Sequence, residues 1–370
     1  MKITSQKADL QSAIAICSRA INSKSTLNMH DCVLIDAKDG RISLTASDSD
    51  FVIETVIEGN IEESGRIALE ATYLDKVIRS LKDNEVTIET KENYRTVITS
   101  ASSKNAALPG KDGTDFNGMP PVDRTDSLKI SEFSLKQIIN QTIFSISPND
   151  SNVLMSSESF EIKENVLRVV SLDGHRISIR KIFLREAYGN RKLIIPGKAL
   201  NELSRILSDD TDKDVEISMS DNRIIFDFGN TTVVSQLVDG TYFDVDQMIM
   251  TDYETKVSVN REALIECLER ARIFIRDGDS KPVIFSITDN NVNIKVKSAV
   301  GSIDDDIPAQ KTGKDIMIGF NAKFLVESLR AVDDEEVSID FVNSKAPCYI
   351  RNDEDNYVYM VLPINFVNVD

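Results

Sequence analysis

Three stretches with one shared pattern decide the fold. Residues 2–17 read KITSQKADLQSAIAIC, residues 129–144 read KISEFSLKQIINQTIF, and residues 256–271 read KVSVNREALIECLERA. Each begins with a short apolar strand pattern and continues as an amphipathic helix, and their first lysines are spaced 127 residues apart. A regular period along a whole chain indicates repeats of one structural unit. The sequence therefore predicts three tandem domains, at residues 1–126, 127–252 and 253–370.

The first helix of each copy carries an apolar stripe with helical spacing. In the first copy the stripe consists of Leu10, Ala13, Ile14, Cys17 and Ile21. The third copy repeats this spacing from Leu264 to Ile275, and the second copy shows it from Leu135 to Ile146, displaced by two residues. Ser131 and Asn260 precede their helices as expected N-caps.

A second helix pattern follows an apolar strand in each copy and ends near Leu81, Leu207 and Val332. Strand patterns fill most of the remaining sequence, and Asp39-Gly40 predicts a tight hairpin turn between two of them. The expected fold class is therefore α+β, with two helices packed on antiparallel sheets in each domain.

Composition limits the possible functions. The 370 residues include 60 Asp and Glu against 43 Lys and Arg, a net charge of −17. This balance argues against nucleic-acid binding unless the basic residues line one surface and the acidic residues another. No apolar run approaches the roughly 20 residues of a membrane span, and the N-terminus has no signal-peptide pattern, so a cytoplasmic location is expected. The four cysteines lie far apart and are expected to be buried reduced thiols.

The sequence offers little for catalysis. Only two histidines are present, and no Gly-rich phosphate loop, nucleophile elbow or zinc-protease motif occurs. Acidic pairs such as Asp333-Asp334 are more typical of a solvated surface than of a general acid and base. We therefore expect no enzyme activity, no catalytic residues, no metal and no cofactor.

Two stretches stand apart from the repeat. In Ser171-Leu-Asp-Gly-His-Arg-Ile177, Asp173 corresponds to Asp48 of the first copy, and the run is either a tight turn alone or a site that only one copy acquired. Near the C-terminus, Tyr357–Phe366 is an apolar run containing Pro363, which cannot donate to a sheet ladder. We expect the chain to leave the sheet there and to expose Ile364 and Phe366 unless a partner or another domain covers them.

Four motifs together resemble one family across the whole chain. They are Asp173-Gly-His-Arg176, Leu237-Val-Asp-Gly240, Ile318-Gly-Phe-Asn321 and Val361-Leu-Pro-Ile364. In this order and spacing the chain is similar to the bacterial DNA polymerase III β subunit, the sliding clamp. The resemblance implies a head-to-tail homodimeric ring that encircles duplex DNA, tethers the replicative polymerase as a processivity factor in DNA replication, and catalyses nothing. An arc of three domains also exposes one unpaired sheet edge at each end, which a second chain closes.

The resemblance implies where DNA is contacted. Lys24, Asn149 and Lys198 fall at the family's DNA-contact positions, and Arg79 and Arg205 belong to the basic residues in or beside the helices. If the helices line a hole, these basic faces meet phosphates without reading sequence. Val153 and Leu154 replace two of the family's aromatic DNA contacts.

The resemblance also implies a partner pocket between the second and third domains, which accepts short peptides carrying a Gln and a hydrophobic-aromatic end. Its residues from the second copy are Met155, Leu172, Gly174, His175, Arg176 and Ile177, and those from the third are Asn321, Phe324, Pro347, Met360, Val361, Leu362, Pro363 and Ile364. His175 and Arg176 are expected to fix the peptide's register. The chain departs from the family at Phe243, which replaces a pocket proline, at Gln247, which replaces a basic residue, and at Met248, which replaces an apolar one.

The dimer seam is expected to be more polar than in relatives, because Ser103-Lys-Asn-Ala106 stands where they have apolar residues. The opposite side keeps Ile273 and Phe274, and Asp304 and Asp305 are expected to face Lys104. Further partners implied by the family are an ATP-driven clamp loader and other polymerases, ligase and mismatch-repair proteins, near the bacterial nucleoid. The competing interpretation is a repeat-built adaptor that binds proteins and does not encircle DNA.

Overall fold

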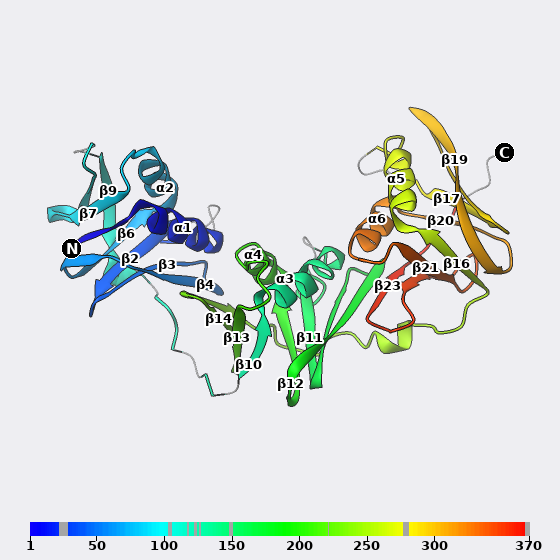
Figure 1. Cartoon of the computed structure of the whole chain (residues 1–370), viewed down its shortest axis with the longest axis horizontal. Coiled ribbons are helices and arrows are strands. Elements are labelled where there is room, and N and C mark those ends of the chain that lie inside the picture. The colour runs from blue at the N-terminus through cyan, green and yellow to red at the C-terminus, as the bar shows by residue number, and fades with distance from the viewer. Residues whose placement is uncertain are drawn as a thin grey trace. The chain divides into compact units, whose positions relative to one another are not determined.

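The computed structural model describes residues 1–21, 29–102, 106–116, 118–121, 124–125, 127–147, 151–220, 222–276 and 281–366. The chain forms two compact units, Met1–Lys136 with Glu202–Leu237, and Gln137–Asn201 with Val238–Asp370. Each unit contains one continuous antiparallel sheet (Figure 1). Within the described part of the chain, no helix has both the length and the apolar character to cross a membrane.

The sheet of the first unit has 13 strands in the order β10-β13-β14-β15-β4-β3-β2-β6-β9-β8-β7-β1-β5. Their bounds are β1 Lys2–Gln6, β2 Cys32–Lys38, β3 Arg41–Ser47, β4 Phe51–Ile57, β5 Asn60–Glu63, β6 Gly65–Glu70, β7 Glu85–Thr90, β8 Arg95–Thr99, β9 Ala106–Asp112, β10 Ser127–Ser131, β13 Asp214–Met219, β14 Arg223–Phe228 and β15 Thr231–Gln236. The predicted Asp39-Gly40 hairpin joins β2 to β3, and both residues have the positive φ (53° and 78°) that this turn requires.

The sheet of the second unit has ten strands in the order β11-β12-β23-β22-β21-β16-β19-β18-β17-β20. Their bounds are β11 Ser157–Leu172, β12 Arg176–Pro196, β16 Thr255–Asn260, β17 Val283–Thr288, β18 Asn291–Ser298, β19 Gly301–Gly313, β20 Ile316–Phe320, β21 Glu336–Phe341, β22 Cys348–Arg351 and β23 Tyr357–Val361.

Six α-helices occur in the described residues: α1 Lys7–Cys17, α2 Ala71–Ser80, α3 Glu132–Asn140, α4 Gly197–Ser204, α5 Arg261–Arg272 and α6 Ala322–Arg330. The predicted stripe of α1 is buried from Leu10 to Cys17, and that of α5 from Leu264 to Ala271. Four predictions ran too long. The stripes expected to reach Ile21 and Ile275 extend past the ends of α1 and α5, α3 ends before Thr142, and α4 ends at Ser204 rather than near Leu207. The α+β fold class is confirmed, and all four cysteines are buried and free, as predicted.

Strand pairing joins the repeated copies. In the first unit, β4 of the first copy pairs with β15 of the second, with Phe51 opposite Ser235. In the second unit, β12 of the second copy pairs with β23 of the third, with Arg176 opposite Val361. The second copy is therefore divided between the two compact units, with the divisions inside α3 and α4. The proposed three-domain boundaries remain a prediction.

Side-chain caps start some helices and are missing from others. The Asn260 side chain accepts a hydrogen bond of 3.0 Å from the Ala263 N–H at the start of α5. Ser131 does the same for Ser134 at 3.1 Å, so both predicted N-caps are confirmed. Gln6 occupies the same position before α1 and makes no side-chain cap bond. The packing of the apolar stripe therefore starts α1 without help from a cap.

This difference predicts the effect of removing a cap. Asn260→Ala should lower the free energy of unfolding by about 1 kcal/mol, because one N–H of the first turn of α5 loses its acceptor. Urea denaturation followed by circular dichroism measures the change. Gln6→Ala is the matched control and should be neutral within about 0.5 kcal/mol. Equal losses in both variants would contradict the assignment.

Candidate partner-binding and DNA-facing sites

The turn between β11 and β12 is built by one aspartate. The Asp173 carboxylate accepts hydrogen bonds from the N–H groups of His175 (2.9 Å) and Arg176 (3.1 Å). Gly174 has a φ of +84°, a conformation that favours glycine. The predicted tight turn is therefore confirmed, whereas a binding role for this stretch remains a prediction. The turn leaves the His175 side chain exposed.

Arg176 is the buried anchor of this turn. Its side chain is only 6% exposed, and its guanidinium donates to Asp173 Oδ2 at 3.0 Å and also to Glu327 and the Phe144 carbonyl. The same group lies 4.3 Å from the centre of the Phe324 ring. This buried guanidinium connects the turn to α6, and its N–H groups donate to partners in the same chain. Arg176 thus positions the surrounding side chains, and its expected contact with a bound peptide remains a prediction.

An apolar cluster lies beside the turn. Leu172, Ile177 and Met360 are buried in it, and Met155 and Phe243 pack against it while remaining partly exposed. The cluster therefore unites residues from β11, β12 and β23 with the connection that follows Val238. Phe243 stands at the position of a family proline, and its ring lies edge-on to Tyr242 with 5.5 Å between ring centres.

The chain that follows β23 closes the other side of the turn. The Leu362 N–H donates to the His175 carbonyl at 2.9 Å, and the Ile364 N–H donates to the Gly319 carbonyl at 2.8 Å. A Cβ on Gly319 would lie 2.8 Å from the Phe366 ring, so only glycine admits this contact. Ile364 and Phe366 do leave the sheet as expected, and β20 covers them in part. Leu362 stays 36% exposed.

We call the turn, the apolar cluster and residues 362–366 together the tail site. Phe324, Pro347 and Asn321, also predicted for the pocket, lie around the tail site. The Phe324 ring stacks on the His175 ring with 6.3 Å between centres, and Pro347 is half-buried directly before β22. Asn321 caps α6 by accepting from the Lys323 N–H at 3.0 Å. Gln247 donates to Asp244 at 2.8 Å, and Met248 is 46% exposed.

Basic side chains gather between α1 and α2 in the first unit. A hollow of about 510 Å³ between these helices is lined by Arg19, Lys76 and Arg79. Arg79 is also paired with Asp75 at 2.8 Å. Exposed pairs of this kind are weak, so phosphate oxygens compete with Asp75 for the guanidinium at little cost.

The other predicted DNA contacts are dispersed or outside the described residues. Arg205 is exposed, and it and Arg19 both pair with Glu202, at 3.2 and 3.5 Å. Lys198 is exposed on α4. Lys24 and Asn149 lie outside the described residues, as does Lys104 of the predicted seam.

Two strand edges are relevant to the predicted dimer. Among the described residues, 106–109 of β9 pair only with β8, and 301–308 of β19 pair only with β18. Near the second edge, Ile273 is 74% exposed and the Phe274 ring packs against Gly301. Both seam aspartates have partners within the chain, since Asp305 pairs with Arg270 at 2.6 Å and Asp304 with Lys295 at 3.2 Å.

Known proteins are similar to this chain along nearly its whole length. Models of the N-terminal, central and C-terminal domains of the DNA polymerase III beta subunit match residues 1–120, 129–244 and 246–365. The beta sliding clamp of Staphylococcus epidermidis is 31% identical over 357 residues, 94% of each chain. The chain belongs to the bacterial DNA polymerase III beta subunit family, the sliding clamps. Members of this family are non-catalytic processivity factors of the polymerase.

Solved structures of the family agree in fold. A putative DNA polymerase III beta subunit from Eubacterium rectale superposes with a TM-score of 0.96 at 48% identity, covering 99% of this chain and all of the other. The sliding clamp of Bacillus subtilis gives 0.95 at 28% identity with the same coverage. The three-domain clamp fold expected from the sequence is therefore confirmed.

Sequence reasoning missed the residues that hold the turn in place. Glu327 and Phe144 complete the surroundings of Arg176, yet Glu327 lies 151 positions away in the sequence. No local pattern distinguishes Glu327 from the other acidic residues of amphipathic helices.

A buried carboxyl near the tail site was also missed. Glu158 on β11 is fully buried, and within the described chain neither of its oxygens accepts a hydrogen bond of ordinary geometry; the nearby Thr142 hydroxyl offsets only part of the effect of burial. Burial raises the pKa of Glu158 well above its usual range, because an unpaired charge is costly in an apolar environment. The carbonyl of its neighbour Ser157 accepts a 3.0 Å hydrogen bond from the hydroxyl of Tyr242, which belongs to the apolar cluster.

This burial predicts a pH-dependent stability. Glu158 stays protonated in the folded chain after it ionises in the unfolded chain, so it removes about 1.4 kcal/mol of stability per pH unit above the unfolded pKa, until the folded pKa is reached. Glu158→Gln abolishes this loss. Its unfolding midpoint in urea should therefore exceed that of the unchanged protein, and the difference should grow from pH 5 to pH 7.

Glu161 on the same strand is the matched control with the opposite sign. Burial alone would raise the pKa of Glu161, but its bonds to Lys192 and Arg168 lower it overall. Its contribution to stability is present above the unfolded pKa and is lost as the pH falls through the folded pKa. Glu161→Gln should therefore destabilise the protein at pH 7. A Glu158→Gln difference that does not change with pH would refute the buried neutral carboxyl.

Proposed function

We propose that two copies of this chain close head-to-tail into a ring that encircles duplex DNA and tethers the replicative polymerase. The observation that carries this proposal is the repeated strand pairing between copies. The same pairing occurs twice within the chain, and the two strands required for a third occurrence have open edges.

The matching strands occupy equivalent places in the repeat. Strands β4 and β19 are each the third strand of a three-strand meander, β2-β3-β4 and β17-β18-β19. Strands β9, β15 and β23 are each the third strand of a second meander, β7-β8-β9, β13-β14-β15 and β21-β22-β23. Because β4 pairs with β15 and β12 with β23, the remaining partners are β19 of one chain and β9 of another. A pairing of this kind removes both open edges.

The distribution of charged residues supports binding to DNA that does not depend on base sequence. The whole chain carries a charge of −17, whereas Arg19, Lys76 and Arg79 line one hollow between α1 and α2. Phosphate contacts from such residues position a duplex without reading its sequence, and the acidic remainder disfavours other contacts with DNA. Retention then depends on the closed ring more than on affinity.

We further propose that the tail site is the peptide-binding pocket that connects the ring to its partners. Apolar walls from Leu172, Ile177 and Met360, with Leu362 exposed at the edge, suit a hydrophobic-aromatic peptide end. The polymerase, an ATP-driven loader and repair proteins are the partners that the family implies. The bacterial cytoplasm, at the nucleoid, is the proposed location.

The ring predicts a topological readout. Protein loaded on circular duplex DNA should be retained, and cutting the circle once should release it, because an open end lets a ring slide off. Ile273→Glu should abolish retention, since the new charge lies on the exposed apolar surface next to the open edge of β19. Gel filtration of loaded DNA, with and without cutting, measures the difference.

Phe183→Glu provides the control, because Phe183 is 75% exposed on β12 and far in sequence from both open edges. This variant should sediment as a dimer and be retained like the unchanged protein. Equal loss from circular and cut DNA in the unchanged protein would refute encirclement.

The tail site predicts a separate loss. Leu362→Ala should weaken binding of the probe peptide acetyl-Gln-Ala-Ala-Leu-Phe-amide about tenfold, because truncation removes apolar surface at the edge of the site. Fluorescence anisotropy with a labelled peptide measures the affinity. Met317→Ala, on a side chain that is 45% exposed in β20, is the matched control and should bind normally. Unchanged binding in Leu362→Ala would count against the tail site.

A further inference from the structure

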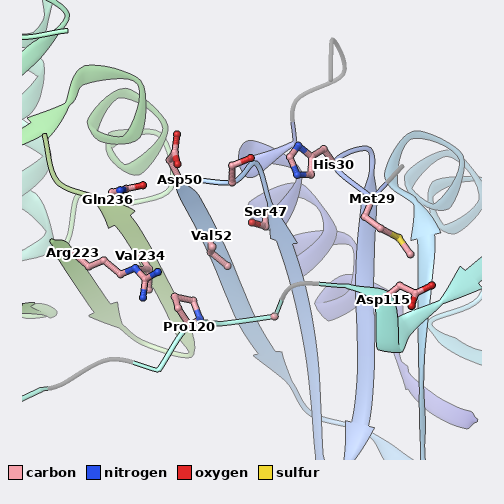
Figure 2. Close-up of a pocket in the computed structure, with 12 residues that line it drawn as sticks. Met29, His30, Ser47, Asp50, Val52, Asp115, Pro120, Arg223, Val234 and Gln236 are labelled. Carbon is pink, nitrogen blue, oxygen red and sulfur yellow. The ribbon is translucent and has the colours of Figure 1, made fainter. Parts of the chain in front are cut away.

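The first unit contains a second hollow, which is separate from the basic hollow between α1 and α2 and from the tail site. It has a volume of about 400 Å³ and lies at the turn between β3 and β4. Figure 2 shows Val52 in its middle, with Arg223 and Val234 on one side and Met29 and His30 on the other. We call it the β3–β4 hollow.

The backbone around this hollow repeats that of the tail site. The Asp48 carboxylate accepts from the Phe51 N–H at 3.2 Å, as the Asp173 carboxylate accepts from the Arg176 N–H at 3.1 Å. Ser49 has a φ of +78° where Gly174 has +84°. Donor and acceptor are three positions apart in both turns, so the two turns have the same construction.

The strand that crosses each turn is also held in the same way. The Gln236 N–H donates to the Asp50 carbonyl at 2.8 Å, and the Leu362 N–H donates to the His175 carbonyl at 2.9 Å. Both donors directly follow the last paired positions of strands that join copies, β15 and β23. The hollow is therefore the structural counterpart of the tail site at the other junction between copies.

The shared register identifies the corresponding side chains one by one. On the turns and their strands, Ser47 corresponds to Leu172, Asp50 to His175 and Val52 to Ile177. These positions line the β3–β4 hollow in the first unit. The backbone frame is conserved, while two of the three side chains have become polar or acidic.

The crossing strands show the same change of chemistry. Val234 corresponds to Met360 and Gln236 to Leu362, because each pair holds the same place in its ladder. Arg223 lies opposite Gln236 and thus corresponds to Pro347, the residue before β22. An apolar site at one junction is matched by a polar site with a guanidinium at the other.

Arg223 is the group in this hollow most in need of a partner. Its side chain is partly buried, and among the described residues it makes no ion pair or side-chain hydrogen bond. Asp50 and Asp115, which also line the hollow, are exposed and remain solvated. A partly desolvated charge gains more from an opposite charge than an exposed one does, so Arg223 favours a carboxylate ligand.

We propose that the β3–β4 hollow is a second peptide-binding site, which takes an extended peptide carrying an acidic side chain. The carboxylate pairs with Arg223, and Asp50 accepts from peptide N–H groups. Val52 and Val234 are buried, with Met119 packed against them, and form the floor of the site. The comparison with the tail site rests on the proposed peptide-binding function of that site. The hollow itself is tested separately.

Methionine methyl groups in the full-length protein report on the two sites independently. Met29 lines the hollow and Met360 lies in the tail site. The probe is acetyl-Ala-Val-Glu-Val-Ala-amide, added to protein labelled with ¹³C at its methionine methyl groups, and Met29→Leu and Met360→Leu assign the two resonances. We expect the probe to shift the Met29 resonance and to leave that of Met360 in place. The same peptide with Gln in place of Glu should bind at least about tenfold more weakly.

A charge exchange provides the decisive control. Arg223→Glu should lose the Glu peptide and bind the Lys counterpart, acetyl-Ala-Val-Lys-Val-Ala-amide. Arg95→Glu changes the same charge at an exposed position on β8 and should bind the Glu peptide normally.

Three results would overturn the proposal: no Met29 shift with the Glu peptide at millimolar concentration, equal affinity for the Glu, Gln and Lys peptides, or equal losses in the two arginine variants. The peptide acetyl-Gln-Ala-Ala-Leu-Phe-amide tests the tail site in the same sample through Met360. A Met29 response supports the hollow whether or not Met360 responds to that peptide.

Discussion

The structure depends on antiparallel pairing between strands of different copies. One copy cannot satisfy the outer edges of its own sheets, and β4–β15 and β12–β23 satisfy them with strands of the next copy. These ladders make one sheet of 13 strands and another of ten from three repeated sequences. The edges left over on β9 and β19 are those that the proposed assembly with a second chain pairs.

Each ladder between copies also creates one of the two places where we propose that peptides bind. A strand that crosses the end of a neighbouring hairpin must be held by the turn, through Asp50 at one junction and His175 at the other. The backbone hydrogen bonds match at both places, so the two places differ in their side chains. Duplication supplied the frame twice, and substitution made one site apolar and the other polar.

Basic side chains occur in two different environments, buried beside the turn and exposed on the helices. The desolvation cost of burying the Arg176 guanidinium is offset by Asp173, Glu327 and the two aromatic rings that surround it. Basic residues on the helices are instead exposed and loosely paired, as Arg79 is with Asp75. The first arrangement stabilises a turn, and the second leaves cations available to phosphates in a chain with a net charge of −17.

The sequence alone determined the repeats, the α+β class, the helix stripes and the caps at Ser131 and Asn260, because these depend on local periodicity and on hydrogen bonds within a few residues. Its resemblance to a known family supplied the tail-site residues. Only the tertiary structure revealed that Arg176 pairs with Glu327, that Glu158 is buried with no ion-pair partner among the described residues, and that the β3–β4 hollow matches the tail site. Those features arise from contacts between residues far apart in the chain, where no local pattern records which side chains meet.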